Sequence, residues 1–141
     1  MKGLLSLVFF ISLSAAAYPT KPDLNFTFPS FCTDRNPDFR EFRYVNKVAI
    51  CSRSVSTELK SKIYDDYKIP LAERVNYTID HLIPLSLGGS NGRENLWPQH
   101  KSINTAEVER RVYEDLSRGR ISYQEALNTI LNLKLKTKDR R

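Results

Sequence analysis

The stretch from Tyr77 to Asn104 constrains the fold more than any other part of the chain. It reads YTIDHLIPLSLGGSNGRENLWPQHKSIN, and its residue types change in the order of strand, glycine-rich loop, strand and helix. Alternation predicts a first strand over residues 74–79 and a second over residues 95–97, and a helical pattern runs from about 102 to 118. A hairpin packed on a helix would bring the polar residues of this stretch to one end of the unit.

The polar and glycine residues of this stretch resemble the pattern of the HNH (ββα-metal) endonuclease family. That pattern is an Asp-His pair, a Pro, a Gly-Gly turn, an Asn-Leu pair, and a final His or Asn nine residues after that Asn. The corresponding elements here are Asp80-His81, Pro84, Gly88-Gly89, Asn95-Leu96 and Asn104. The N-terminal arm, the two cysteines and the NLWPQ sequence are similar to secreted bacterial members in particular.

The resemblance implies a role for each polar residue. His81 would be the general base, Asp80 and Asn104 would hold one divalent metal ion, and Asn95 would pin the loop that orients His81. A neutral imidazole suits the deprotonation of water near neutral pH. Carboxylate and amide oxygens suit Mg²⁺, the expected metal, which keeps several of its waters. The products would carry a 5′ phosphate and a 3′ hydroxyl.

Asn104 has a second interpretation. The sequence Asn104-Thr105-Ala106-Glu107 is also a capping box, in which Asn104 would only cap the following helix. His100 precedes Asn104 by one helical turn and is then the alternative metal ligand. With His100 as a ligand, Mn²⁺, Ni²⁺ or Zn²⁺ would be more suitable. The sequence leaves both possibilities open.

The N-terminus predicts export. Lys2, the apolar run of residues 4–13 and Ala15-Ala16-Ala17 form the pattern of a signal peptide over residues 1–17, and the run is too short to span a bilayer. The protein is therefore expected to be secreted or periplasmic, without stable membrane association. Cys32 and Cys51 then lie in an oxidising compartment, and we expect them to form one disulfide bond.

The mature chain, residues 18–141, is expected to form one α+β domain around a core motif at about 74–118. Residues 18–37 predict an irregular arm tied down by Cys32, and residues 39–50 contain the residue types of a short strand. Ser56 or Thr57 can cap a helix reaching about Tyr67. The capping box from Ser122 to Glu125 begins a last helix, with Ala126, Ile130 and Leu133 facing inward.

The chain is basic, with a net charge of +6, and removal of Lys2 with the signal peptide leaves 21 − 16 = +5. A basic surface suits a polyanionic partner such as nucleic acid. The residues expected to contact the phosphate backbone are Arg74, Arg93, Lys101, Arg110 and Arg111, with the tail residues Lys134, Lys136, Lys138, Arg140 and Arg141.

The sequence thus predicts a monomeric, metal-dependent endonuclease of low sequence specificity, acting on DNA in preference to RNA. One alternative is a non-catalytic module that binds nucleic acid or another polyanion. The presence of both Asp80 and His81 argues against it, since a binding module has no need of that pair. Another alternative is a toxin or effector nuclease, whose partner would include a dedicated inhibitor protein.

Overall fold

The structure is a computed structural model that describes residues 19–136. Within that range the protein is an α+β fold with two small antiparallel sheets. The predicted signal peptide and the tail residues Lys138, Arg140 and Arg141 lie outside the described residues. The strands are β1 (Phe39–Arg43), β2 (Val48–Cys51), β3 (Tyr77–His81) and β4 (Leu96–His100), and the α-helices are α1 (Thr57–Asp66), α2 (Ala106–Ser117) and α3 (Tyr123–Leu135). Short 3₁₀ turns cover Leu71–Asn76, Leu85–Leu87 and Arg93–Asn95.

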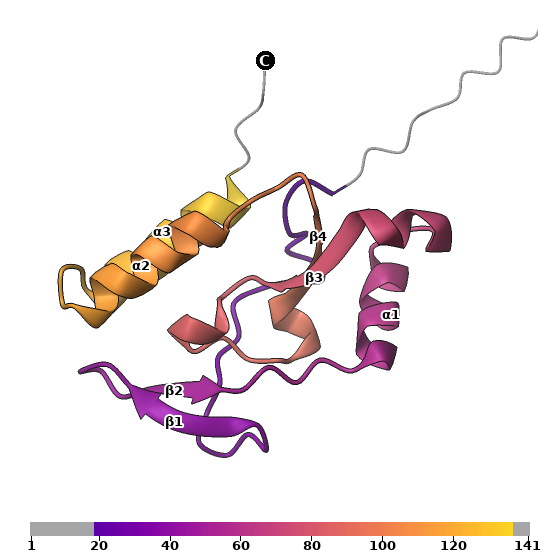
Figure 1. The fold of residues 1–141 in the computed structure, drawn as a ribbon. Coiled ribbons are helices and arrows are strands. Elements are labelled where there is room, and N and C mark those ends of the chain that lie inside the picture. Colours follow the sequence, from indigo (N-terminus) through magenta and orange to yellow (C-terminus); the bar gives the residue numbers. More distant parts are fainter. Residues whose placement is uncertain (1–18, 137–141) are drawn as a thin grey trace, which may run out of the picture.

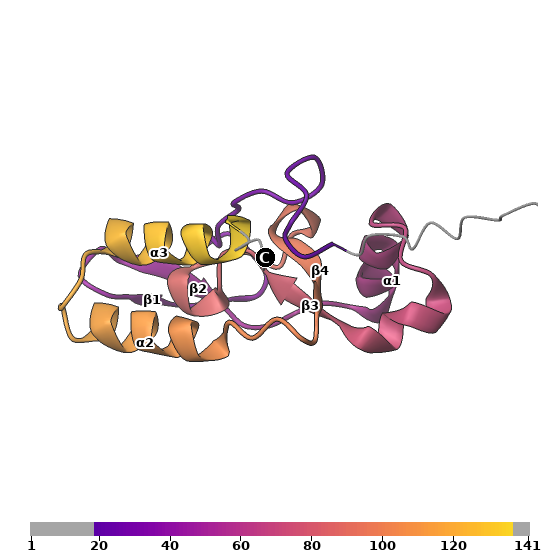
Figure 2. The same cartoon turned by 90° about the horizontal axis from the view of Figure 1, so that it is seen from above.

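The β3–β4 hairpin lies in the middle of the molecule, with α1 on one side and the α2–α3 pair on the other (Figures 1 and 2). A small cluster of Ile63, Ile79 and Leu96 packs α1 against the hairpin. A larger cluster joins α2 and α3 to the loop after β3; it consists of Ile83, Leu87, Val112, Leu116, Ala126, Leu127 and Ile130. Burial of these side chains supplies the main stabilisation, and it fixes the end of β3 between two apolar clusters.

The register of the hairpin determines where the two ends of each strand lie. Tyr77 pairs with His100 at one end, and His81 pairs with Leu96 at the other. Along β3, Tyr77, Ile79 and His81 are buried, whereas Asp80 is only half-buried. Neighbouring residues of a strand point to opposite faces, so Asp80 and His81 meet different surroundings.

Three boundaries differ from the sequence prediction. The first strand begins at Tyr77 and not at residue 74, because Pro70 starts a 3₁₀ turn that occupies residues 71–76. The second strand continues to His100, beyond the expected end at residue 97. The helix α2 begins at Ala106 and not near residue 102.

Two of the three side-chain caps predicted from the sequence are confirmed. The Ser56 side chain accepts the backbone N–H of Leu59 at the start of α1. Ser122 and Glu125 form a reciprocal capping box at the start of α3. Between α2 and α3, Gly119 adopts a φ of +67°, the left-handed conformation that ends many helices.

The Cys32–Cys51 disulfide is also confirmed, with 5.8 Å between the two Cα atoms. It joins the N-terminal arm to β2. The arm runs along the loop between β3 and β4, where the Cys32 N–H donates to the Gly88 carbonyl and the buried Thr27 hydroxyl donates to the Leu96 carbonyl. The arm is therefore part of the wall around the hairpin.

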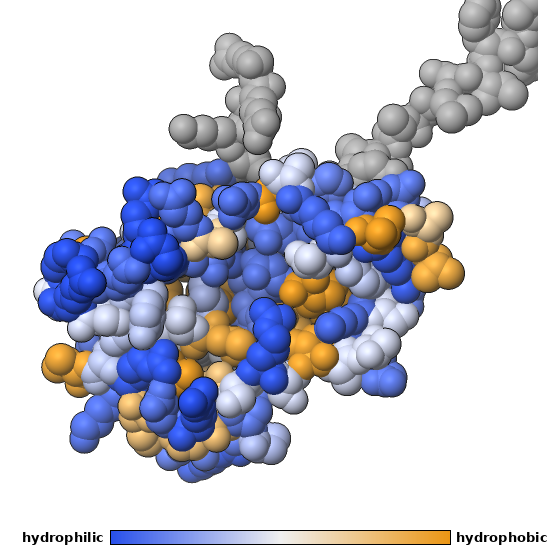
Figure 3. All heavy atoms as spheres, in the orientation of Figure 1, coloured by the Kyte–Doolittle hydropathy of each residue, from blue (hydrophilic) through white to orange (hydrophobic). Residues whose placement is uncertain are grey.

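The surface drawn in Figure 3 is mostly hydrophilic, with hydrophobic side chains scattered among polar ones. Among residues 19–136, no helix is long and apolar enough to cross a membrane.

Candidate active site

His81, the predicted general base, lies at the end of β3 and is 2% exposed. Its Nε2 atom lies 3.0 Å from Oδ1 of Asn91, in the loop between β3 and β4. A buried polar ring needs such a partner, because an unsatisfied ring nitrogen would cost free energy on burial.

The electrostatic surroundings keep the His81 ring neutral. Burial is the largest influence and lowers the pKa of the imidazole below its ordinary value of 6.5. The hydrogen bond with Asn91 acts in the opposite direction, and the positive charge of Arg53 lowers the pKa further. A neutral imidazole near pH 7 is the protonation state that a general base requires.

Asp80, the predicted metal ligand, forms an ion pair across the fold. Its Oδ2 atom lies 2.7 Å from Nζ of Lys134 on α3, and Oε1 of Glu109 on α2 lies 2.9 Å from the same nitrogen. The Lys134 ammonium also donates to the backbone carbonyl of His81 at 2.5 Å. Its side chain is fully buried, while the two carboxylates are each about one-fifth exposed. Lys134 thus joins β3, α2 and α3.

Asn95, the residue predicted to pin the loop, is fully buried directly before the start of β4. Its side-chain oxygen accepts the Ile83 N–H at 2.9 Å, and its amide donates to the carbonyls of Ile83 and Ser90 at 3.0 and 2.9 Å. Gly89 makes this approach possible, because a Cβ atom there would lie 1.8 Å from the Ile83 carbonyl oxygen. Asn95 closes the loop but has no direct contact with His81 among those described.

The two candidates for the second metal ligand lie in different places. His100 lies at the opposite end of the hairpin from His81. The two residues are four register positions apart, which corresponds to about 13 Å along the strands. The His100 ring bonds to the Ser102 hydroxyl and packs edge-on against Tyr77. The Asn104 side-chain oxygen accepts the Ala106 N–H, but the residue that precedes α2 is Thr105, so the capping box expected from Asn104 to Glu107 is not formed.

Compared with known proteins, the chain matches no family model, no curated protein and no solved structure.

The predicted ligand pair does not fit a divalent metal ion in this arrangement. The Asp80 carboxylate faces a buried ammonium at 2.7 Å, and the oxygen of Asn104 is directed at a helix backbone. Residues 19–136 contain no cluster of three or more His, Cys, Asp or Glu side chains that could hold a metal. The metal dependence itself is tested by none of these observations and stays a prediction.

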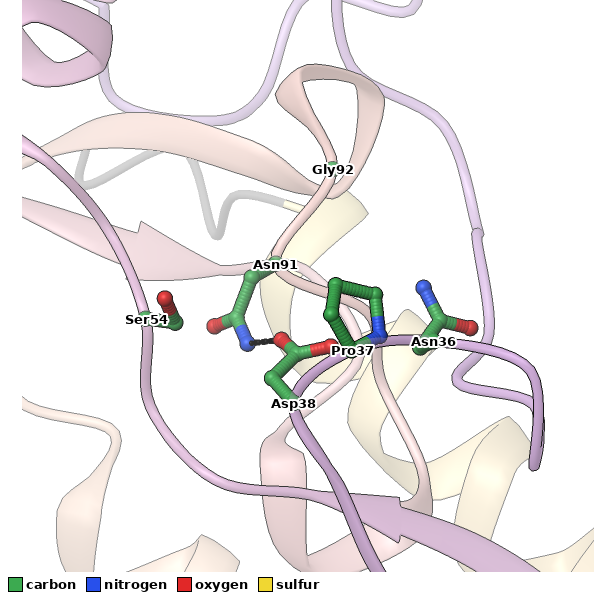
Figure 4. A pocket seen from close by; sticks show the side chains of 6 residues that line it. All are labelled: Asn36, Pro37, Asp38, Ser54, Asn91 and Gly92. Atoms are coloured by element: carbon green, nitrogen blue, oxygen red, sulfur yellow. Dashed lines mark hydrogen bonds between the residues drawn. The ribbon is translucent and has the colours of Figure 1, made fainter.

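A surface hollow of about 370 Å³ lies beside Asn91, and Figure 4 shows the side chains that line it. It is lined by Asn36, Pro37, Asp38, Ser54, Asn91 and Gly92. The Asn91 side chain points at Asp38 across the hollow and donates to the Asp38 carboxylate (Figure 4). Asn91 therefore links the buried His81 ring to a polar surface.

The residues predicted to contact phosphates divide into two groups. Arg74 and Arg93 are largely buried, and they are paired with Asp65 and Asp66 at 2.5 and 2.8 Å. Lys101, Arg110 and Arg111 are exposed. Lys134 was expected to contact phosphates with the rest of the tail, and that expectation is wrong, because its side chain is buried against Asp80 and Glu109.

Sequence reasoning missed three residues of the site: Asn91, Asp38 and Lys134. For Lys134 a signal exists, since it continues the spacing of four from Ala126 and Ile130 and so falls on the buried face of α3. For Asp38 and Asn91 the sequence carries no comparable signal, because 53 residues separate them.

Proposed function

We propose that the protein is a secreted nuclease that hydrolyses phosphodiester bonds, with His81 as its general base. The observation that carries the proposal is the buried His81 ring, bonded to Asn91 at the closed end of the β3–β4 hairpin. The resemblance of the Asp80-His81, Gly88-Gly89 and Asn95 pattern to HNH endonucleases supports the same reading.

The proposed chemistry is an attack of water on phosphorus. The water oxygen bonds to phosphorus, the bond from phosphorus to the 3′ oxygen breaks, and the proton of the water passes to the imidazole. The departing 3′ oxygen takes a proton from solvent. A general base of this kind contributes about a hundredfold or more to the rate.

The rest of the site supports this role by holding His81 in place. Asn95 fixes the loop on one side, and Lys134 fixes the His81 carbonyl on the other. No step of the proposed reaction uses a metal ion, because the Asp80 carboxylate is paired with Lys134 and the Asn104 oxygen is bonded to the start of α2. Metal dependence is retained as a prediction from the resemblance and is tested separately.

Nucleic acid is the proposed substrate, bound through its phosphates with little sequence preference. Arg53 is exposed and close enough to affect His81 electrostatically, which suits a residue that holds the scissile phosphate. Lys101, Arg110 and Arg111 are exposed cations for further contacts. The disulfide suits an oxidising compartment, in keeping with the proposed export.

The proposal is tested by nicking of supercoiled plasmid, with single-stranded and duplex DNA and RNA as further substrates. We expect His81→Ala to lower the turnover by at least about a hundredfold while binding to a labelled oligonucleotide survives. His100→Ala is the matched control, because it removes the other histidine at the far end of the hairpin. Equal cutting by His81→Ala and the parent protein would refute the assignment. Binding without cutting by the parent itself would favour the non-catalytic binding module.

A further inference from the structure

The orientation of the Asn91 side chain is fixed by two acceptors. Its Nδ2 atom donates to the Ser52 carbonyl at 2.7 Å and to the Asp38 carboxylate. A carbonyl oxygen and a carboxylate only accept hydrogen bonds. A flipped amide would direct its own oxygen at both of them, so the amide nitrogen must lie on that side and Oδ1 must face His81.

This orientation determines which nitrogen of His81 is basic. Oδ1 of Asn91 only accepts, so the hydrogen of the 3.0 Å bond belongs to Nε2 of His81. A neutral imidazole carries one ring hydrogen, which leaves the lone pair on Nδ1.

The geometry points to Asp38 and Asn91 as positioning residues that select the Nε2–H tautomer and thereby make Nδ1 the atom that accepts the proton. This inference rests on the proposed function for its catalytic meaning, whereas the tautomer itself does not depend on it. Neither residue belongs to the pattern that suggested the site, which gave the orienting role to Asn95.

The two acceptors come from the disulfide-linked part of the chain. Asp38 lies between the bonded cysteines and directly precedes β1, and Ser52 directly follows Cys51. The Ser52 N–H donates to the Asp38 carbonyl at 2.8 Å, so the acceptors are held together. The β1–β2 hairpin, which the ββα pattern does not include, thus supplies the groups that orient the base.

The tautomer can be measured directly by long-range ¹H–¹⁵N correlation spectra of ¹⁵N-labelled protein at pH 8. The chain has two histidines, so His100→Gln assigns the two sets of ring signals. We expect His81 to show a protonated Nε2 and an unprotonated Nδ1. The opposite pattern would overturn the inference whether or not the protein cuts nucleic acid.

Variants test whether Asn91 and Asp38 cause that preference. Asn91→Ala should move the His81 shifts toward a mixture of tautomers and lower kcat by about tenfold to a hundredfold with little change in KM. Ser54→Ala is the matched control, since Ser54 lines the same hollow. Asp38→Ala should act like Asn91→Ala, while Asp38→Asn keeps an acceptor oxygen and should restore the tautomer.

The outcomes separate the tautomer from the catalytic role. A pure Nε2–H tautomer in folded Asn91→Ala would show that Asn91 does not select it. If Asn91→Ala does not fold, the comparison of Asp38→Ala with Asp38→Asn decides the same question. Asn91→Ala could lose the Nε2–H tautomer while the parent protein itself never cuts nucleic acid. That result would support Asn91 as the residue that selects the tautomer and would overturn the proposed function alone.

Discussion

The Lys134 ammonium lies 2.7 Å from the Asp80 carboxylate, although 54 residues separate them in the sequence. Glu109 lies 2.9 Å from the same nitrogen, so one positive charge is paired with two negative ones. The buried position explains why this lysine is part of the core and not of the basic tail. It also means that the site of the predicted metal is beside a cation that the chain itself supplies.

Replacement of Lys134 should therefore destabilise the fold and create an affinity for cations. Lys134→Met leaves the carboxylates of Asp80 and Glu109 facing each other, and breaking a buried ion pair costs about 3–5 kcal/mol. Thermal melts in EDTA should show that loss, and added Mn²⁺ should recover part of it. Lys136→Met, an exposed neighbour, is the control. An unchanged melt for Lys134→Met would contradict the buried ion pair.

The metal dependence predicted from the resemblance can be tested with the native chain. Plasmid nicking in EDTA, followed by titration of Mg²⁺ or Mn²⁺, measures it directly. We expect Asn104→Ala to cost about 1 kcal/mol of stability and leave the metal titration unchanged, because the side chain bonds to the start of α2. A large shift of the metal titration by Asn104→Ala would instead restore it as a ligand.

The stability of the protein should depend on pH through His81. Its folded pKa lies below its ordinary value, since burial disfavours the charged ring, and Arg53 and Lys134 oppose the charge while Asp80 and the Asn91 bond favour it. Between the folded pKa and 6.5 the unfolded chain binds more protons than the folded chain. The stabilisation is therefore complete above pH 6.5 and is lost as the pH falls toward the folded pKa, by at most about 1.4 kcal/mol per pH unit.

Denaturant unfolding from pH 8 to pH 5 measures this dependence. The slope of the unfolding free energy against pH should decrease in His81→Gln, because glutamine cannot be protonated. The slope should persist in His100→Gln. Equal slopes for the parent and His81→Gln would show that the folded pKa of His81 is not lowered.

Arg53 should contribute to the binding of nucleic acid. Arg53→Ala removes an exposed cation near His81, so affinity should fall for all sequences alike and the salt dependence should weaken by about one phosphate contact. Fluorescence anisotropy at several salt concentrations measures both effects. Arg120→Ala is the control, because Arg120 is paired with Asp115 at the turn between α2 and α3. Identical salt slopes for the parent and Arg53→Ala would exclude this contact.

The sequence predicted the parts of the fold that depend on local chemistry. Ser56 and the Ser122–Glu125 box marked the starts of helices because capping involves residues three positions apart. The β1–β2 hairpin was harder to place, because its turn uses Tyr44 and Lys47 at positive φ instead of the usual glycine or asparagine. The Lys101 N–H donates to the Asn76 carbonyl, so the hairpin pairing continues past His100, close to where the helix was expected to begin.

The candidate site shows the same difference between residues marked by local sequence patterns and residues placed by long-range contacts. Asp80, His81 and Asn95 could be singled out because they lie within one short stretch with recognisable spacing. The partners of these residues could not, because Asn91 is oriented by Asp38 from the N-terminal part and Asp80 is paired by Lys134 from the last helix. Such pairings are decided by packing of distant segments, and periodicity of a single sequence carries no information about them.

The disulfide has a consequence for the cell that makes the protein. Asp38 and Ser52, which orient Asn91, are held by the loop that Cys32 and Cys51 close. In a reducing cytosol the disulfide is open, and the acceptors are then held only by the pairing of β1 with β2 and by the Ser52–Asp38 bond. Under the proposed function and export, a newly made chain would hold its base less firmly until its thiols oxidise. Oxidation after export would then raise the activity, and nucleic acid inside the producing cell would be cut more slowly.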